Sequence, residues 1–500
     1  MFFRESRLNP LAWIPAVQST WWSWCPFLES NSVKSLIRKG YEEINKALGL
    51  PFRIKYWSHE YIIMPAKYLK DLKTARKDHA SFSESIQDVF FLRSFVGDLF
   101  QTDRMVYTVK KGLNPHLNEA TDLCIGEAEG AFRAEMGDCE SWTSLPALDL
   151  LCGIAHRIAS RILVGEEVCR NPAFQGASAE YFQGHAMLGF ILLHIPIRAI
   201  REVLKVPLSY FQRRRQRRVL SLVSSVMRKR LEARLSGKDG EDHIDCMSWT
   251  LKIKDDFPKS KNEDQFWQMS HELIHLLGAS HAPTGMALTQ LLWLILDEPQ
   301  YLEPLRKEAE EAIAQYGMTS KLFSHLPLQD SFIRETNRLH SNNKLGIPRQ
   351  IMGEPFTFHD GFTIPPGTRI AFPVDQYTRD PDVFPDPETF NGFRYVRLSE
   401  DDARTEEGVN QWKASHAHQW NLVFGYGAHV CPGRFFAIRL MKIVLTKLLV
   451  EYDIRSEWPQ GGVPPSFYIE GSAVPHRTAK MSFRRRSAAK TEFTAKGKED

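Results

Sequence analysis

Cysteine is scarce in this chain, and its spacing is as informative as its number. Only seven cysteines occur among 500 residues. They are scattered and odd in number, and no two of them stand in a Cys-x-x-Cys pair. This excludes a disulfide framework and a zinc site built on such pairs. It is typical of a reducing compartment that faces the cytosol.

An excess of charge of one sign is also lacking. Lys and Arg number 64 and Asp and Glu number 60, which gives a formal net charge of +4. Because proteins that bind polyanions carry a strong basic excess, this balance argues against nucleic acid as a partner. The sharpest local run of charge is Arg213–Arg218, with the sequence RRRQRR. We interpret it as the solvated start of a helix, with contact to an anionic membrane surface as the alternative.

Long apolar runs are absent as well. A membrane span needs about 18 consecutive apolar residues, and no stretch of this sequence reaches that length. Residues 1–30 are rich in tryptophan (Trp13, Trp21, Trp22 and Trp24), but polar residues interrupt them and no signal-peptide pattern is visible. Since indole rings favour membrane interfaces, this segment is predicted either to lie at such an interface or to pack on the protein.

The composition is that of an ordinary globular protein, 43% hydrophobic and 25% charged. Apolar periodicity predicts helices at 32–48, 66–81, 266–296, 299–316 and 329–342, and across most of 102–235. Residues 52–64 have a strand-like alternation, and residues 355–374 combine short β-prone runs with Asp-Gly and Pro-Pro-Gly turns. The fold class predicted is mainly α with small β-sheets. The polar residues 487–500 are predicted to form a disordered tail.

One cysteine stands in a distinctive loop, Phe424-Gly-Tyr-Gly-Ala-His-Val-Cys-Pro-Gly-Arg-Phe-Phe-Ala437. Glycines permit close backbone turns, and an apolar helical run begins directly after Pro432 and Gly433. The free N–H groups of a helix start favour a thiolate, so Cys431 is a candidate metal ligand. The alternative for a single cysteine is a buried free thiol.

The spacing of Phe424, Gly427, Cys431, Gly433 and Ala437 resembles the haem-binding loop of the cytochrome P450 family, in its fungal form. His429 occupies the position where the family usually has a basic residue. The resemblance implies a single mixed domain over residues 31–486, with Cys431 as the axial ligand of haem iron. Thiolate in that position favours O–O cleavage.

The same resemblance implies the activity and the partners. The implied activity is that of a monooxygenase that hydroxylates, epoxidises or desaturates a hydrophobic small molecule. The implied electron source is NADPH, through a separate cytochrome P450 reductase. The fungal form favours a terpenoid or polycyclic secondary metabolite as substrate. Relatives of this kind are anchored to membranes, so we expect a peripheral location on the cytosol-facing endoplasmic reticulum membrane, or a cytoplasmic one.

Two further motifs agree with the resemblance. Glu335 and Arg338 are three residues apart, which places them on one helix face, and they resemble the family's Glu-x-x-Arg motif. Arg394, within Phe390-Asn-Gly-Phe-Arg-Tyr395, is the implied third member of this triad. We interpret the triad as a scaffold for the loop and not as catalytic. Arg349 and Lys110 or Lys111 are implied to bind the haem propionates, with a surface role as the alternative.

A rival motif overlaps the long helix predicted at 266–296. His271, Glu272, His275, Gly278 and His281 fit the HExxHxxGxxH signature of zinc metalloproteases, in which histidines bind zinc and the glutamate activates water. Apolar helical sequence nevertheless continues through Leu296. In a continuous helix His281 would lie about 240° around the axis from His275, too far to share its metal. The zinc site is retained as a remote alternative.

In the resemblance to cytochromes P450, this helix crosses the haem opposite the cysteine. Gly278 and Ala279 match the small residues that open a groove for dioxygen, and His281 matches the fungal counterpart of the acid. Ala282 replaces the threonine that normally follows. Pro283 lacks the N–H for residue 279 and is expected to kink the helix. We expect this face to look onto haem and substrate.

The absence of a threonine hydroxyl at position 282 affects the expected oxygen chemistry. Oxygen activation consumes protons that a chain of positioned groups must deliver, so His281 and Thr284 are tentative members of that relay. His275 is predicted to lie near the substrate pocket, and a hydrogen-bonded buried histidine is the equal alternative. A haem-thiolate isomerase or dehydratase, which acts on an already oxygenated substrate without the usual relay, stays open as the second function.

Overall fold

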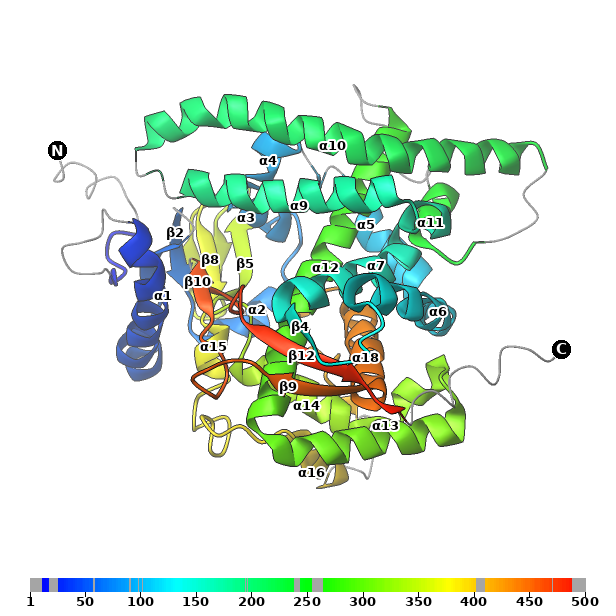
Figure 1. The fold of residues 1–500 in the computed structure, drawn as a ribbon. Coiled ribbons are helices and arrows are strands. Elements are labelled where there is room, and N and C mark those ends of the chain that lie inside the picture. Colours follow the sequence, from blue (N-terminus) through cyan, green and yellow to red (C-terminus); the bar gives the residue numbers. More distant parts are fainter. Residues whose placement is uncertain are drawn as a thin grey trace.

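The computed structural model describes residues 11–17, 26–56, 59–89, 91–97, 99–100, 102–193, 195, 197–237, 243–253, 264–401, 410–469 and 471–487. Helices dominate these residues; the largest sheet lies at the left of Figure 1, and strands β9 and β12 run across its lower middle. The helices are α1 (Pro26–Gly40), α2 (Leu69–Thr74), α3 (Phe82–Val89), α4 (Leu92–Phe95), α5 (Arg104–Tyr107), α6 (Leu117–Met136), α7 (Ala147–Leu163), α8 (Glu166–Cys169), α9 (Pro172–Leu193), α10 (Arg198–Leu235), α11 (Cys246–Lys252), α12 (Gln265–Asp297), α13 (Leu302–Tyr316), α14 (Pro327–Leu339), α15 (Val374–Tyr377), α16 (Arg394–Asp401) and α18 (Arg434–Glu451).

The strands form several small sheets. The largest has the order β1-β2-β8-β5-β3, and the others are β4-β12-β9, β10-β11 and β6-β7. Their bounds are β1 (Phe52–Tyr56), β2 (His59–Ile63), β3 (Ala80–Ser81), β4 (Thr143–Pro146), β5 (Gly346–Ile351), β6 (Phe356–Thr357), β7 (Thr363–Ile364), β8 (Arg369–Phe372), β9 (Tyr452–Ser456), β10 (Phe467–Ile469), β11 (Ser472–Val474) and β12 (Lys480–Arg485).

The core is built on α12, which passes through the centre of the molecule (Figure 1). It continues from Gln265 to Asp297 through Pro283, so the proline does not end the helix. On one side α12 packs closely on α7, because Gly285 has no side chain: a Cβ there would lie 2.5 Å from Cys152 Sγ and 2.7 Å from Cys152 Cα. Figure 1 also shows α9 and α10 side by side across one end of the molecule.

The segment predicted as a helix at 66–81 is shorter in the structure. A 3-10 turn over Ala66–Tyr68 leads into α2, which ends at Thr74. Ala80 and Ser81 then form β3, paired antiparallel with Ile351 and Gln350 of β5. The prediction failed at its C-terminal half because the free edge of a strand that is distant in sequence supplies backbone partners there.

The interpretation of Arg213–Arg218 as a helix start is also wrong. The run lies in the middle of α10, a helix of 38 residues. Most of its guanidinium groups are exposed, and Arg218 pairs with Glu180 of the neighbouring α9. The run is therefore solvated as expected, but the apolar residues on its N-terminal side extend the helix by several turns.

The described part of the N-terminal segment packs on the sheet. Leu11, Ile14 and Val17 are buried, and Arg53 of β1 donates through Nε to the carbonyl of Ile14. Trp13 is 57% exposed and meets Phe362 edge to face. The other tryptophans of residues 1–30 and all but the first residue of the predicted tail at 487–500 lie outside the described residues. Within the described residues, no helix is long and apolar enough to cross a membrane.

Candidate active site

The loop that carries Cys431 is shaped by its glycines. Gly425 and Gly427 have φ values of 78° and 69°, in the left-handed region that favours glycine. A Cβ on Gly427 would lie 2.6 Å from the Cα of Lys73, at the end of α2. The amide of Cys431 donates to the carbonyl of Phe424 over 2.8 Å, which closes the loop. The loop can therefore approach α2 only with glycine at position 427.

The start of α18 surrounds the thiol with donors. Backbone N–H groups of Gly433 and Arg434 face Cys431, and α18 begins at Arg434. Burial raises the pKa of the Cys431 thiol above its usual value, whereas these N–H groups and the charge of Arg434 lower it. A bound cation would add to the groups that favour thiolate. The donor set thus suits a thiolate that binds a metal ion.

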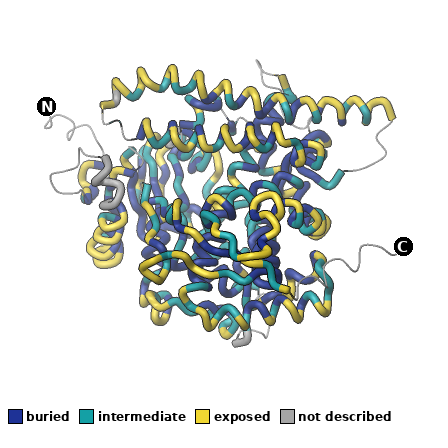
Figure 2. Tube along the Cα trace, viewed as in Figure 1, coloured by how far each residue is buried: buried dark blue, intermediate teal, exposed yellow. Residues whose placement is uncertain are grey.

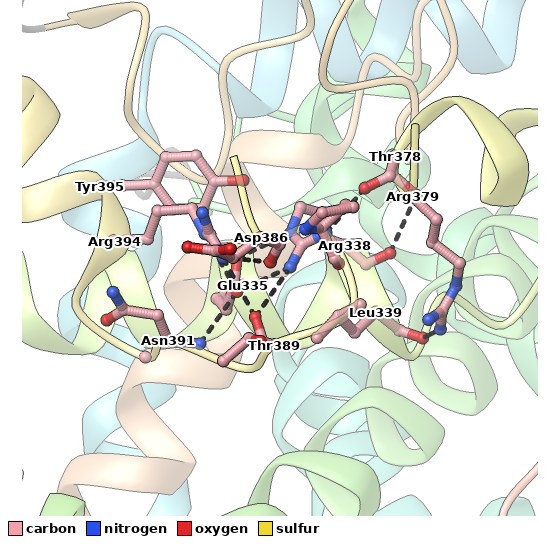
Figure 3. Close-up of polar contacts among 12 residues, drawn as sticks. Glu335, Arg338, Leu339, Thr378, Arg379, Asp386, Thr389, Asn391, Arg394 and Tyr395 are labelled. Atoms are coloured by element: carbon pink, nitrogen blue, oxygen red, sulfur yellow. Dashed lines mark hydrogen bonds and ion pairs between the residues drawn. The ribbon is translucent and has the colours of Figure 1, made fainter. Parts of the chain in front are cut away.

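Behind the loop, Glu335 pairs with two arginines (Figure 3). Its carboxylate accepts from Arg338 Nε and Nη2 over 2.8 and 2.9 Å and from Arg394 Nε over 3.2 Å. The amide of Asn391 adds a further bond of 3.0 Å. Glu335 and Arg338 are almost completely buried. A buried carboxylate that satisfies two guanidinium groups is the geometry that such charges require.

The triad joins α14 to the segment that leads toward the cysteine loop. Arg338 Nη1 donates to the carbonyls of Thr378 and Pro387 over 2.7 and 2.6 Å. Arg394 Nη1 donates to the carbonyl of Pro385 over 2.8 Å. Figure 3 shows Arg338 and Arg394 meeting at Glu335, with Thr389 and Asn391 beside them. The structure therefore brings together the three charged residues that the sequence singled out, although their sequence separation reaches 59 residues.

A cationic cluster lies beside the loop. Arg349 of β5 is 2% exposed, and its Nη2 has no hydrogen-bond partner among the described residues. Its Nη1 donates to the carbonyl of Pro348, and burial lowers the pKa of Arg349 to about 10. Burial, together with the charges of Arg349, Lys77 and Lys110, lowers the pKa of His429 to about 4. The unpartnered buried guanidinium fits an anionic group, such as a carboxylate of haem.

Lys110 and Lys111 lie on a π-helical turn, Thr108–Leu113, and both are exposed. The charge of Lys110 acts on His429, so Lys110 belongs to the cationic cluster, whereas nothing comparable links Lys111 to it. Asn114, just after this turn, donates through Nδ2 to the carbonyl of Pro432 over 3.2 Å. Sequence reasoning missed Asn114, which ties this turn directly to the cysteine loop.

On α12 one stripe differs from the rest of the helix. Ala279 and Pro283 are exposed although the neighbouring Leu277 and Thr284 are buried. Gly278 and Ala282 are half-buried at the edges of this stripe. A Cβ on Gly278 would lie 2.6 Å from the ring of Phe182, so glycine there is required by packing on α9. The exposed stripe thus consists of Ala279 and Pro283, with Gly278 and Ala282 at its edges. That this face looks onto haem and substrate stays a prediction.

The proposed relay residues lie on another side of α12. The His281 ring meets His156 of α7 at 4.9 Å and Phe182 of α9 at 4.8 Å between centroids, and its Nδ1–H donates to the carbonyl of Leu277. Thr284 is buried next to Gly285, where α12 packs on α7. Residue 281 is about 200° around the helix from residue 279. The relay expected from His281 and Thr284 is therefore not assembled on the exposed stripe.

His275 is held between α12 and α9. Its Nδ1 is 2.8 Å from the carbonyl of His271, so this nitrogen carries the hydrogen, because a carbonyl only accepts. Nε2 then accepts from the hydroxyl of Tyr181 over 3.1 Å. Burial lowers the pKa of His275 well below its usual value. Both ring nitrogens are satisfied, which matches the alternative of a hydrogen-bonded buried histidine.

The zinc protease is contradicted by the same region. Glu272 accepts from Arg104 Nε over 2.9 Å and from Thr102 over 3.3 Å, so it is engaged in a buried ion pair. Burial raises the pKa of Glu272 to about 7, against the effect of Arg104. His281 faces α7 and not His271 or His275. The residues that the structure describes contain no group of three or more side chains able to hold a metal ion.

The comparisons with known proteins agree with this architecture. The cytochrome P450 family model matches residues 139–483. Cytochrome P450 monooxygenase sirB of Leptosphaeria maculans is 32% identical over 456 residues, which is 90% of this chain and 86% of the relative. Ent-kaurene oxidase P450-4 of Gibberella fujikuroi is 27% identical over 91% of this chain and 88% of the relative.

A further relative and a solved structure extend the likeness. Pyrichalasin C-7 hydroxylase of Pyricularia grisea is 28% identical over 91% of this chain and 89% of that protein. The retinoic acid-bound cyanobacterial CYP120A1 superposes with a TM-score of 0.65 at 17% identity, over 91% of this chain and 96% of the other. The fold and the matched sequence extend far beyond the cysteine loop. The chain belongs to the cytochrome P450 family of haem-dependent monooxygenases.

Proposed function

We propose that this enzyme uses haem held by Cys431 to oxidise a hydrophobic terpenoid or polycyclic secondary metabolite, with NADPH electrons from a reductase. The observation that carries the assignment is the buried, unpartnered Nη2 of Arg349 beside His429 and the glycine-shaped Cys431 loop. A thiol and a buried cation at one site suit a ligand that joins a metal ion to carboxylates. When bound, haem would supply oxygen activation, which a thiolate ligand favours.

The residues of the site have separate roles in this proposal. Cys431 binds the iron, and Phe424, Gly427 and Gly433 shape the loop around it. Arg349, His429 and Lys110 hold the propionates. Since haem carries two carboxylates, its binding would give the buried guanidinium of Arg349 the anionic partner that it needs.

The exposed stripe of α12 is proposed to border the substrate. Ala279 and Pro283 leave space beside the helix, and Pro283 has no N–H to donate to the Ala279 carbonyl. An apolar stripe of this kind suits a hydrophobic substrate. The names of two relatives, an ent-kaurene oxidase and a pyrichalasin hydroxylase, support a terpenoid or polycyclic class.

The proposal is tested on Cys431 itself. In the wild type, carbon monoxide added to the reduced protein should give the difference spectrum of a haem thiolate. Cys431→Ser should lose that signal, because a hydroxyl is a far weaker iron ligand than a thiolate. Cys152→Ser, which alters a half-buried cysteine of α7, serves as the control. An unchanged spectrum in Cys431→Ser would exclude this cysteine as the ligand.

The second candidate function, a haem-thiolate isomerase or dehydratase, depends on the residues of α12. Neither His281 nor Thr284 lies on the exposed stripe, and Ala282 offers no hydroxyl, which favours an isomerase or dehydratase that needs no proton relay. Dependence of turnover on NADPH and reductase separates the two functions. NADPH consumed per product, compared between wild type and Ala282→Thr, then tests the relay: equal, tight coupling in both would show that the missing hydroxyl does not matter.

Peripheral contact with a membrane is proposed through the junction of α9 and α10. Exposed apolar side chains gather there, at Met187, Ile191, Ile197, Ile200, Val203, Val206, Tyr210 and Phe211. Figure 2 shows exposed residues recurring along both helices, between intermediate and buried ones. The exposed arginines of the 213–218 run follow on α10 and suit an anionic surface, such as that of the endoplasmic reticulum.

Flotation with anionic lipid vesicles tests this contact. The wild type should float, and a double variant Val203→Ser with Val206→Ser should float less, because both side chains are at least 70% exposed. A matched double variant at Leu48→Ser and Leu235→Ser, which are exposed elsewhere, should float like the wild type. Equal flotation of the two double variants would exclude this face.

A further inference from the structure

A separate cavity of about 140 Å³ lies away from the cysteine loop. Its walls come from α1, the C-terminal half of α12, the segment after α14 and the β10–β11 hairpin. Basic and hydrogen-bonding side chains line much of it: Lys34, Gln290, His340, Lys344, Arg379 and Tyr468. No residue of the 424–433 loop takes part in this lining. The cavity is therefore a second site, chemically unlike the apolar stripe of α12.

Positive charge exceeds negative charge in this cavity. Lys344 Nζ lies 2.6 Å from Asp375, and Arg379 Nε lies 3.6 Å from the same buried carboxylate. Lys34 adds a further cation whose hydrogen-bond partner is the Tyr468 hydroxyl at 3.4 Å. Among the described residues Lys34 forms no ion pair. Arg379 also pairs with Glu388 over 2.5 Å, so Lys344 and Arg379 are balanced by two carboxylates. Among the described residues, Lys34 is therefore the cation of this cavity that has no counter-charge.

His340 completes the set of donors. Its Nδ1 accepts from the amide of Gln290 over 3.1 Å, so in the neutral ring Nε2 carries the hydrogen. Burial lowers the pKa of His340 to about 4, with the charges of Arg379 and Lys344 adding to the effect. The ring therefore stays neutral, is a hydrogen-bond donor through Nε2, and lies in a positive field.

We propose that this cavity is an oxyanion subsite that binds a carboxylate or phosphate group through Lys34, the Tyr468 hydroxyl and Nε2–H of His340. Charge-assisted hydrogen bonds to an oxyanion are stronger than bonds between neutral groups. The volume suits one small group and not a whole terpenoid, since a cavity of about 150 Å³ holds a molecule of benzene size. The subsite does not depend on haem.

The position of the subsite relates it to the α12 stripe. Gln290 follows Pro283 by seven residues, which is nearly two full turns and about 10 Å along the same helix face. Asn342, which lines the cavity, donates through Nδ2 to the carbonyl of Pro283 over 3.3 Å. The oxyanion is therefore either the acidic end of a ligand that lies along the stripe or a free ion beside it.

Calorimetric titration of inorganic phosphate and of acetate into the haem-loaded full chain, at constant ionic strength, tests the subsite. The wild type should bind each at one saturable site. Lys34→Gln should weaken binding about tenfold, because it removes a charge-assisted bond. Lys34 is exposed and pairs with no carboxylate in the part of the chain that the structure describes, so this change is expected to leave the fold intact. Lys39→Gln, an equal change of charge on the same helix, should bind like the wild type.

Ser466→Asp provides an independent check, because it places a carboxylate in the cavity wall and should abolish binding. Absence of saturable binding in the wild type, or equal affinities of Lys34→Gln and Lys39→Gln, would overturn the proposal. Competition between phosphate and palmitate, but not methyl palmitate, would identify the acidic end of a ligand. Phosphate binding without competition would identify a free ion. The carbon monoxide spectrum of the same preparation reports on Cys431 separately.

Discussion

Around Glu335 charged groups meet in a buried triad, whereas the buried histidines of α12 and of the neighbouring α7 are neutral. Glu335 holds two arginines within 3.2 Å, and these arginines bind the carbonyls of the neighbouring segment. On the other side, burial lowers the pKa values of His156, His275 and His281, and these rings pack against aromatic side chains.

The two regions differ in how their buried polar groups are stabilised. Paired buried charges fix geometry strongly, because removing one partner leaves the other uncompensated. Replacing a buried neutral histidine leaves no uncompensated charge, so we expect it to cost less than the loss of one member of the Glu335 triad. The following substitutions test this contrast, beginning with the largest expected effect.

Glu335→Ala should have the largest effect. It leaves Arg338 and Arg394 buried without their carboxylate, which costs about 3–5 kcal/mol of unfolding free energy. Soluble yield and thermal denaturation measure the loss. Glu310→Ala, which removes an exposed partner of Arg486, should change stability by less than about 1 kcal/mol. Similar losses in both variants would mean that burial of the triad does not matter.

Gly427→Ala should follow, at about 2–4 kcal/mol, because it combines a strained backbone with a clash against Lys73. Haem content per protein and thermal denaturation are the measurements. Gly353 has nearly the same φ, 67°, with no atom within 4 Å of an added Cβ, so Gly353→Ala isolates the backbone cost. If the two variants retained haem equally, the contact of the loop with α2 would be unimportant.

Gly285→Ala tests the packing of α12 on α7 and should cost about 1–3 kcal/mol. The added methyl group meets the backbone nitrogen and Cα of Cys152, which do not move as easily as a side chain. Gly189→Ala on α9 has open space and should be neutral or slightly stabilising. Chemical denaturation compares them, and a stable Gly285→Ala protein would show that α7 can shift.

The smallest effect is a dependence on pH. Burial lowers the pKa of His156 to about 3, so below pH 6.5 the unfolded chain takes up a proton that the folded one does not. Because of His156, the free energy of unfolding should therefore fall by up to about 1.4 kcal/mol for each unit by which the pH drops below 6.5. In His156→Gln the decline between pH 6.5 and 5 should be shallower. The exposed His325→Gln should keep the wild-type slope; a shared slope in all three proteins would contradict the prediction.

Local patterns predicted much of the fold. The helix predicted at 266–296 is α12 within one residue at each end, because apolar residues recur at helical spacing along the whole segment. The short runs within 355–374 became β6, β7 and β8. The helix prediction at 66–81 failed where β5 offers backbone partners, and the arginine run was misplaced because nothing in its own sequence marks the start of α10.

Among the site residues, sequence separation decided what was predictable. Glu335 and Arg338 are neighbours on one helix turn, so their pairing follows from spacing. Arg104 lies 168 residues before Glu272, and no local pattern announces that ion pair. No local pattern announces the contact between His156 and His281 either. Because of this contact His281, a predicted relay residue, does not lie on the exposed stripe.

The sequence by itself determined the family, the glycine-bounded cysteine loop and the small residues of α12, because each is a local pattern of residue types at fixed spacing. Only the tertiary structure decided which side of α12 is exposed, which histidines are neutralised by burial, and that Arg349 keeps a buried nitrogen without a partner. These properties depend on what packs around each group, and segments distant in sequence supply that environment.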